Sequence, residues 1–247
     1  MISLIIEKKA SEFRNQYGIG ANDSIRLKSL LSKLNVLTVY RPLKSNFSGM
    51  AIKIKDGDSV KRFILVNSNK TIGNQHFTIC HELYHLYVQE EFSSMACNTG
   101  IFNKKDKEEF NSDLFASYLL LPESGLKVLI PDNELGKNKI LLKTILKIEQ
   151  YFSCSRSALL YRLKQLNIID SARYDLLKEN VKRSALEFGY NIDLYEAGNH
   201  NLVIGDYGTI ARDLFEKGDI SESNYFTLLL DLGMNVDEIE KIGNEEQ

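Results

Sequence analysis

The chain has 247 residues, of which 43% are hydrophobic and 26% are charged, and its formal net charge is −2 at pH 7. These values are ordinary for a globular protein and leave room for one large domain or for two smaller ones. They exclude a strongly basic nucleic-acid binder and a polyanionic tail, and they leave a local basic face open.

The cysteines and the N-terminus predict a soluble, cytoplasmic protein with no membrane partner. The three cysteines, Cys80, Cys97 and Cys154, are odd in number and show no paired spacing, which argues against a disulfide-stapled secreted fold. The apolar run at the N-terminus stops at Ile6, too short for a signal-peptide core or a membrane span.

The first part of the chain predicts two helices followed by three short strands. Apolar residues recur at helical spacing over 3–17 and again over 25–34. Three β-rich or alternating runs follow, at 36–40, 50–55 and 62–66. Their close spacing predicts a small antiparallel sheet, and the strand at 49–55 is a candidate edge for the addition of a peptide substrate.

The rest of the chain is mostly helical in pattern. Helical periodicity covers 75–90 and 106–121, and Pro122 ends the second run. Glycines and prolines between 123 and 138 mark the main boundary. We therefore expect an α+β protein in three parts: a domain with the sheet at 1–125, a helix-turn-helix-like segment at 126–170, and a mostly helical module of unknown role at 171–247.

The segment His81-Glu82-Leu83-Tyr84-His85 contains the pattern H-E-x-x-H. Residues four apart share one face of a helix, so the two imidazoles can converge on one cation. A catalytic zinc site uses three protein ligands plus water, and Glu82 is placed to take a proton from zinc-bound water. The alternative is an exposed helix with incidental His and Glu. The apolar surroundings favour a buried helix instead, where unpaired polar groups are costly.

The third ligand is predicted on the next metal-site helix. Glu109 and Asp113 are four residues apart and share a face. Glu109 is the predicted ligand, and Asp113 is predicted to hydrogen-bond the free nitrogen of one histidine. Glu108 is the rival, and acidic residues also favour a helix N-terminus for electrostatic reasons alone. We expect one Zn²⁺ per chain, although a His₂Glu set also tolerates Mn or Fe.

Two runs resemble the motifs of the ImmA/IrrE-type metallopeptidases. Residues 77–86, FTICHELYHL, look like the family pattern F-T-x-A-H-E-x-x-H. Residues 109–122, EFNSDLFASYLLLP, are similar to the family's second motif and follow at a similar distance. The resemblance covers residues 20–125 well and extends loosely to about residue 170.

The resemblance implies a zincin-like catalytic domain with His81, His85 and Glu109 as zinc ligands and Glu82 as the general base. Known members cleave helix-turn-helix transcriptional repressors. The function implied here is therefore that of a zinc-dependent endopeptidase in transcription regulation, with such a repressor as its protein substrate.

Some features of the site are left open by the sequence. Three departures from the family pattern lie outside the ligand set and bear on substrate choice: His76, Ser112 and Leu121 replace the usual Arg, Ala and Met. The donor that stabilises the oxyanion is not fixed either. Tyr84, His76, Tyr87 and His200 are all conceivable donors.

Two of the cysteines could regulate activity. A thiolate at Cys97, in the predicted loop between the metal-site helices, could occupy the open zinc position and hold the enzyme off. Cys80, next to His81, could be redox sensitive. The alternative for both is an ordinary role as a small hydrophobic residue.

The second helix of the 139–167 pair carries Arg156, Arg162 and Lys164. As a basic face these residues would bind DNA or dock a repressor. The near-neutral overall charge favours a helical hairpin that covers the catalytic core, so direct DNA binding is not the preferred interpretation.

The alternative for the whole chain is a non-enzymatic regulator, or a toxin–antitoxin or phage-defence partner, that binds DNA or a repressor through its C-terminal half. The presence of Glu82 argues for the enzyme, because a purely structural zinc site has no use for this residue.

Overall fold

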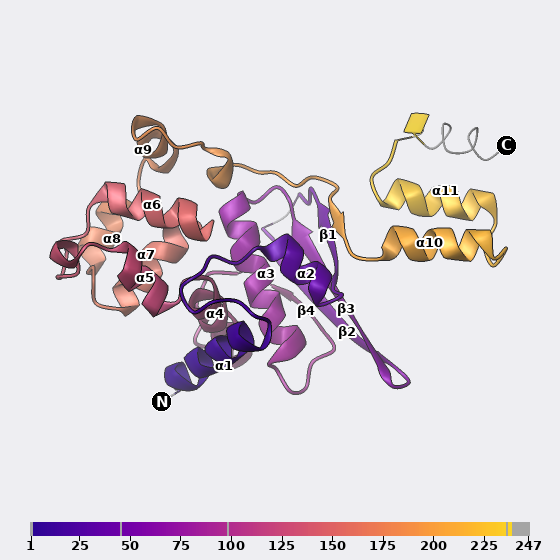
Figure 1. The fold of residues 1–247 in the computed structure, drawn as a ribbon, viewed down its shortest axis with the longest axis horizontal. Helices are drawn as coiled ribbons and strands as arrows, with labels where there is room; N and C mark the ends of the chain where they lie inside the picture. Colours follow the sequence, from indigo (N-terminus) through magenta and orange to yellow (C-terminus); the bar gives the residue numbers. More distant parts are fainter. Residues whose placement is uncertain (1, 45, 98, 236, 239–247) are drawn as a thin grey trace.

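The computed structural model describes residues 2–44, 46–97, 99–235, 237 and 238. Across these residues a mixed sheet in the order β4-β2-β3-β1-β5 lies beside the helix that carries the H-E-x-x-H pattern (Figure 1). Its strands are β1 Leu37–Arg41, β2 Gly49–Asp56, β3 Ser59–Asn67, β4 Ser94–Cys97 and β5 Val203–Ile204. The three predicted strands are confirmed, and the α+β class is confirmed with them.

The prediction of an antiparallel sheet is wrong for one pair of strands. β2 runs antiparallel to β3, but β1 runs parallel to β3. After β1 the chain does not form the neighbouring strand of the sheet next. It first forms β2, which lies two positions away from β1. The β2–β3 hairpin then returns β3 into the gap, where it follows the direction of β1.

The edge strands β4 and β5 were not among the three predicted strands. β4 is only four residues long, and it pairs with the first half of β2, with Gly49 opposite Cys97 and Ile52 opposite Ser94. β5 comes from the C-terminal region and pairs antiparallel with β1. Both pairings join segments far apart in sequence, which local patterns do not reveal.

Four helices belong to the same part of the fold as the sheet: α1 Ile2–Gln16, α2 Leu27–Lys33, α3 Ile72–Tyr87 and α4 Lys107–Leu120. α3 packs on β2 and β3, and α4 packs between α3 and α1. Thr71 caps α3 by accepting from the backbone N–H of Asn74, and Asp106 caps α4 by accepting from Glu108 and Glu109. Pro122 restricts Leu121 and so ends α4.

The remaining helices follow α4. They are α5 Glu123–Leu129, η1 Asp132–Glu134, α6 Leu142–Phe152, α7 Arg156–Gln165, α8 Ser171–Leu177, α9 Val181–Glu187, η2 Asp193–Tyr195, α10 Tyr207–Glu216 and α11 Glu222–Asp231. The C-terminal region is thus mostly helical, as predicted. One hydrophobic core continues across position 125, with Leu121, Leu126 and Leu159 all fully buried in it. The boundaries near 125 and 170 stay predictions.

Two arginines of α7 face the protein interior. Arg156 is 3% exposed and forms an ion pair with buried Glu149 on α6. Arg162 is also 3% exposed, and its guanidinium binds the carboxylate of Glu7 at 2.7 Å and the backbone oxygen of Leu121 at 3.2 Å. Two of the three side chains of the predicted basic face on α7 are therefore buried, and Lys164 is the one of the three that is exposed.

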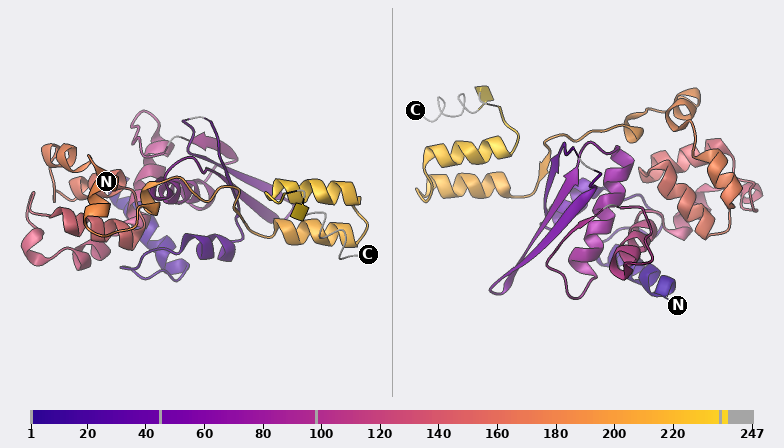
Figure 2. Two further views of the ribbon diagram at one scale, coloured as in Figure 1. Left: turned by 90° about the horizontal axis from the view of Figure 1, so that it is seen from above. Right: turned by 180° about the vertical axis from the view of Figure 1, so that it is seen from behind.

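The pair α10–α11 stands apart from the rest of the molecule, beyond β1 and β5 (Figures 1 and 2). It has a small core of its own, formed by Ala211, Tyr225 and Leu229. The rings of Phe215 and Tyr225 stack there with their centroids 4.7 Å apart. Among the described residues, no helix is long and apolar enough to cross a membrane.

Candidate metal centre

Two histidines of α3 bring their ring nitrogens together in the protein interior. The Nε2 atoms of His81 and His85 lie 3.2 Å apart, and both side chains are fully buried. The helical spacing of four residues puts them on the face of α3 that meets α4. This is the convergence that the H-E-x-x-H pattern predicts.

α4 supplies a carboxylate to the same point. Oε2 of Glu109 lies 3.5 Å from Nε2 of His81, and Oε1 of Glu109 lies 3.4 Å from Nε2 of His85. Its neighbour Glu108 points elsewhere and accepts a hydrogen bond from the hydroxyl of Tyr84 at 2.9 Å. Of the two rival residues, the structure therefore brings Glu109 to the histidines.

Asp113 fixes the ring of His81. Its Oδ1 lies 2.9 Å from Nδ1 of His81, and its two oxygens accept from the backbone N–H groups of Gly100 and Phe102 at 2.8 and 2.7 Å. Because Asp113 acts as an acceptor, the imidazole donates from Nδ1. Nε2 then keeps its lone pair and points at Glu109.

Gln89 fixes the second imidazole in the same way. Its Oε1 lies 2.6 Å from Nδ1 of His85, while its Nε2 donates to the backbone oxygen of Glu91 at 3.2 Å. The lone pair of Nε2 of His85 therefore also faces the site. The sequence analysis missed Gln89, although its position four residues after His85 on the same helix was the available signal.

Three acceptor groups converge here, and a positive charge is needed between them. The donor atoms of His81, His85 and Glu109 all lie within 4.8 Å of one another, and Oε1 of Glu109 is buried without a hydrogen-bond partner. Two nitrogens held about 2.0–2.1 Å from zinc at the tetrahedral angle lie about 3.3–3.4 Å apart. The observed separation of 3.2 Å between the two Nε2 atoms is close to this value, and each imidazole has one oxygen of Glu109 at 3.4 or 3.5 Å.

The pKa values of His81 and Glu109 are both shifted in the direction that favours the charged form of the side chain. Burial opposes the charged form of His81, but its hydrogen bonds, with Asp113 first, raise its pKa well above the usual value. Burial also opposes the charged form of Glu109, and the nearby imidazoles of both histidines lower its pKa to about 2. Glu109 is thus held as a carboxylate, the form that binds a metal.

Glu82 lies beside the cluster and does not belong to the group formed by the candidate ligands His81, His85 and Glu109. It is fully buried, and its pKa is raised, chiefly by burial. Oε1 accepts a hydrogen bond from Sγ of Cys97, and Oε2 has no hydrogen-bond partner. A buried carboxylate with a raised pKa and a free oxygen is suited to proton transfer.

Comparison with protein families matches residues 31–164 to Peptidase_M78, described as the IrrE N-terminal-like domain. The match covers more than half of the chain. The chain belongs to this peptidase family. A search of curated proteins found no match. Family membership assigns a metallopeptidase-type hydrolase, and the cluster described above supplies a group of side chains that can hold the metal of such an enzyme.

The four oxyanion candidates of this peptidase have other partners. Nδ1 of His76 lies 2.7 Å from the backbone oxygen of Ser153, and the hydroxyl of Tyr84 is held by Glu108. The hydroxyl of Tyr87 donates to the backbone oxygen of Leu34, just after α2. Nδ1 of His200 is hydrogen-bonded to the hydroxyl of Ser68. The ring of Tyr84 packs edge-on against the ring of His85, one of the candidate metal ligands. In the described part of the chain, each of these hydroxyl or imidazole groups has its hydrogen-bond contact outside the cluster of His81, His85 and Glu109.

Ser112 is a polar neighbour of the site where the family usually has alanine. Its Oγ lies 3.1 Å from Nε2 of His81 while it donates to the backbone oxygen of Glu109 at 2.8 Å. The departure noted in the sequence therefore touches a predicted ligand atom.

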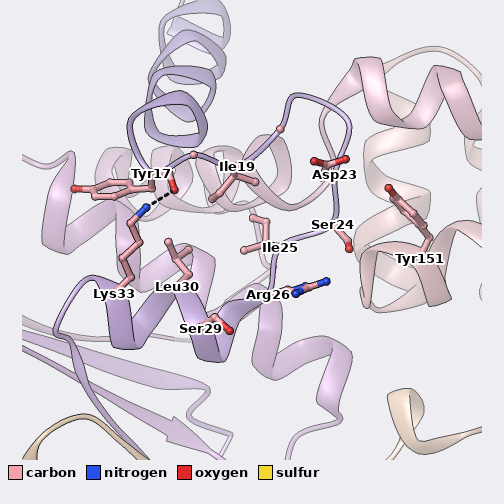
Figure 3. A pocket seen from close by; sticks show the side chains of 12 residues that line it. Tyr17, Ile19, Asp23, Ser24, Ile25, Arg26, Ser29, Leu30, Lys33 and Tyr151 are labelled. Atoms are coloured by element: carbon pink, nitrogen blue, oxygen red, sulfur yellow. Dashed lines mark hydrogen bonds between the residues drawn. The ribbon is translucent and has the colours of Figure 1, made fainter.

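A pocket of about 490 Å³ lies away from this centre, between the end of α1 and α2 (Figure 3). Tyr17, Asp23, Arg26 and Lys33 are among its lining residues, and Lys33 donates to the backbone oxygen of Tyr17. It contains none of the histidines or glutamates of the metal centre. The chemistry of the site therefore does not take place in this pocket.

Proposed function

We propose that the chain is a zinc-dependent endopeptidase that cleaves a protein substrate, a helix-turn-helix transcriptional repressor. The observation that carries the proposal is the convergence of His81, His85 and Glu109 on one point, with the unpartnered Oε2 of Glu82 beside them. This donor set leaves one position of a tetrahedral metal open, as a catalytic zinc site requires.

In this proposal, one zinc ion is held by His81, His85 and Glu109. Asp113 and Gln89 hold the two imidazole rings so that each presents its Nε2 lone pair. Bound zinc polarises the scissile carbonyl and lowers the pKa of water.

Glu82 acts as the general base and then as the general acid. Burial raises its pKa, so its carboxylate accepts a proton more readily than an exposed glutamate does. It takes the proton of the attacking water and returns it to the leaving amine, so that no net proton is consumed in the cycle. Its unpartnered Oε2 is the oxygen available for this transfer.

The substrate is proposed to bind as an extended peptide beside the sheet. β4 already covers the first half of the β2 edge, so the peptide would pair with the outer edge of β4 or replace it. A cavity of about 270 Å³ near the start of α3 has Phe77, Phe102 and Tyr161 among its walls. Its walls also include Lys70, Asn74 and Ser157, so it would take a substrate side chain that carries a polar group.

The experiment uses zinc-loaded protein and purified helix-turn-helix repressors encoded near its gene. Mass spectrometry of the fragments is expected to show one cleavage position, absent with Glu82→Gln and absent after chelation. Binding of a repressor without any cleavage by metal-loaded wild type would refute the peptidase proposal and favour a non-enzymatic regulator.

A further inference from the structure

Cys97 is the last residue of β4 and lies at the general base. It is 3% exposed, and its Sγ lies 2.5 Å from Oε1 of Glu82 and 3.2 Å from the backbone oxygen of Gly49. The pairing of Cys97 with Gly49 across β4 and β2 sets this position, because β2 passes close over Glu82. A Cβ atom on Gly49 would come within 3.1 Å of Oε1 of Glu82.

The thiol also belongs to a second group of metal-binding atoms. Donor atoms of His81, Glu82 and Cys97 all lie within 4.8 Å of one another, and all three residues are buried. This group shares His81 with the set formed by His81, His85 and Glu109. Since Nδ1 of His81 is held by Asp113, only Nε2 can bind a metal, so the two groups meet at the same atom.

The position between Glu82 and the metal site is where the attacking water of a metallopeptidase binds. In a peptidase of this type the attacking water must contact both the metal and the general base. The sulfur of Cys97 lies within contact distance of Glu82 and close to His81, next to the place that this water requires. Thiolate is a strong ligand of zinc.

We propose that Cys97 is a fourth protein ligand that closes the metal site in a resting state of the enzyme. This inference rests on the proposed function. When the thiol binds, its S–H bond breaks, the sulfur lone pair forms the bond to the metal, and the proton passes to Oε1 of Glu82. The water position is then filled and the base is already protonated, so hydrolysis is blocked twice.

The fold allows such a ligand to come and go. β4 is four residues long, lies at the edge of the sheet, and pairs with β2 alone among the described strands. No group of described donors contains Cys97 together with both His85 and Glu109, so β4 must move toward the helices to complete the four-ligand set. Separation of β4 from β2 would withdraw the thiol and free the strand edge for a peptide.

The contrasting cysteines show what is particular to Cys97. Cys80 and Cys154 are also free and fully buried, but neither belongs to a group of metal-binding side chains among the described residues. Cys154→Ala is therefore the matched control, since it removes one buried thiol remote from the metal ligands.

The test is cobalt substitution of the full-length protein, followed by absorption spectroscopy. Cobalt(II) shows visible bands when it is bound and an additional near-ultraviolet charge-transfer band only when a thiolate binds it. We expect the charge-transfer band in wild type and in Cys154→Ala, and its complete loss in Cys97→Ser with the visible bands retained. A second measurement is alkylation of Cys97, read by mass spectrometry, which bound zinc is expected to slow at least tenfold.

The outcomes separate this inference from the proposed function. Visible bands in wild type without the charge-transfer band would overturn the role of Cys97 and leave the metal site standing. A charge-transfer band that persists in Cys97→Ser would also overturn it. Failure of wild type to bind cobalt or zinc at all would overturn both proposals.

Discussion

Replacement of Asp113 by alanine tests whether this residue holds His81 in its metal-binding orientation. Asp113 is 2% exposed and serves three donors: Nδ1 of His81 and the backbone N–H groups of Gly100 and Phe102. A hydrogen bond to a charged group contributes about 1.5–3 kcal/mol. Loss of the two backbone bonds alone should therefore lower the free energy of unfolding by about 3 kcal/mol or more.

The loss of the third bond should appear in metal binding. Mutation of a residue that orients a metal ligand typically reduces metal affinity by about 10–100-fold. We would measure zinc affinity by competition with a chromophoric chelator, and stability by urea unfolding of the metal-free protein. Asp106→Ala is the matched control, since it removes the N-terminal cap of the same helix and should cost about 1 kcal/mol without weakening metal binding. Zinc affinity of Asp113→Ala within twofold of wild type would refute the reasoning.

Three further predictions concern the base, a buried ion pair and a close packing contact. Glu82→Gln should bind metal as wild type does and slow peptide cleavage by about 10²–10⁴-fold, measured on a substrate that wild type cleaves. Arg156→Ala leaves the carboxylate of Glu149 buried without its ion-pair partner, and urea unfolding should show a loss of about 3–5 kcal/mol. Gly49→Ala would put a Cβ 2.4 Å from Cγ2 of Thr78, and calorimetry should show a loss of about 1–3 kcal/mol with slower cleavage.

Each of these predictions has a control. Wild-type cleavage by Glu82→Gln would remove that residue from the chemistry. For Arg156→Ala, metal content should be unchanged, and a stability loss below about 1 kcal/mol would contradict a buried ion pair. Gly57→Ala, at the tip of the β2–β3 hairpin, meets no atom within 4 Å and should cost only the strain of its positive φ, with normal cleavage. Equal cleavage defects in the two glycine variants would contradict the packing argument.

Local sequence patterns were sufficient for the residues that share a helix face. His81 and His85 are one turn apart on α3, and Glu109 and Asp113 are one turn apart on α4, so spacing alone predicted which side chains could meet. The same spacing favoured Glu109 over its rival Glu108, because Glu109 shares a face with Asp113 and adjacent residues differ by about 100° around a helix. That choice depends on how α4 packs against α3, and the roles of these residues as metal ligands stay predictions.

Contacts between distant segments were beyond the reach of the sequence. The placement of Cys97 against Glu82 requires the pairing of β4 with β2, and a strand of four residues leaves little periodic signal. The parallel alignment of β1 with β3 depends on the route of the connection after β1. The charges of Arg156 and Arg162 suggested an exposed face, yet both side chains point inward. Arg156 pairs with buried Glu149, and Arg162 binds half-buried Glu7 and the backbone oxygen of Leu121.

The most direct test of the central claim is metal content, measured by elemental analysis of purified wild type, His81→Ala, Glu109→Ala and Glu108→Ala. The account predicts about one zinc per chain in wild type and in Glu108→Ala, and loss of the metal in the other two variants. Absence of metal from wild type even after zinc is added, or metal retained in both His81→Ala and Glu109→Ala, would contradict it.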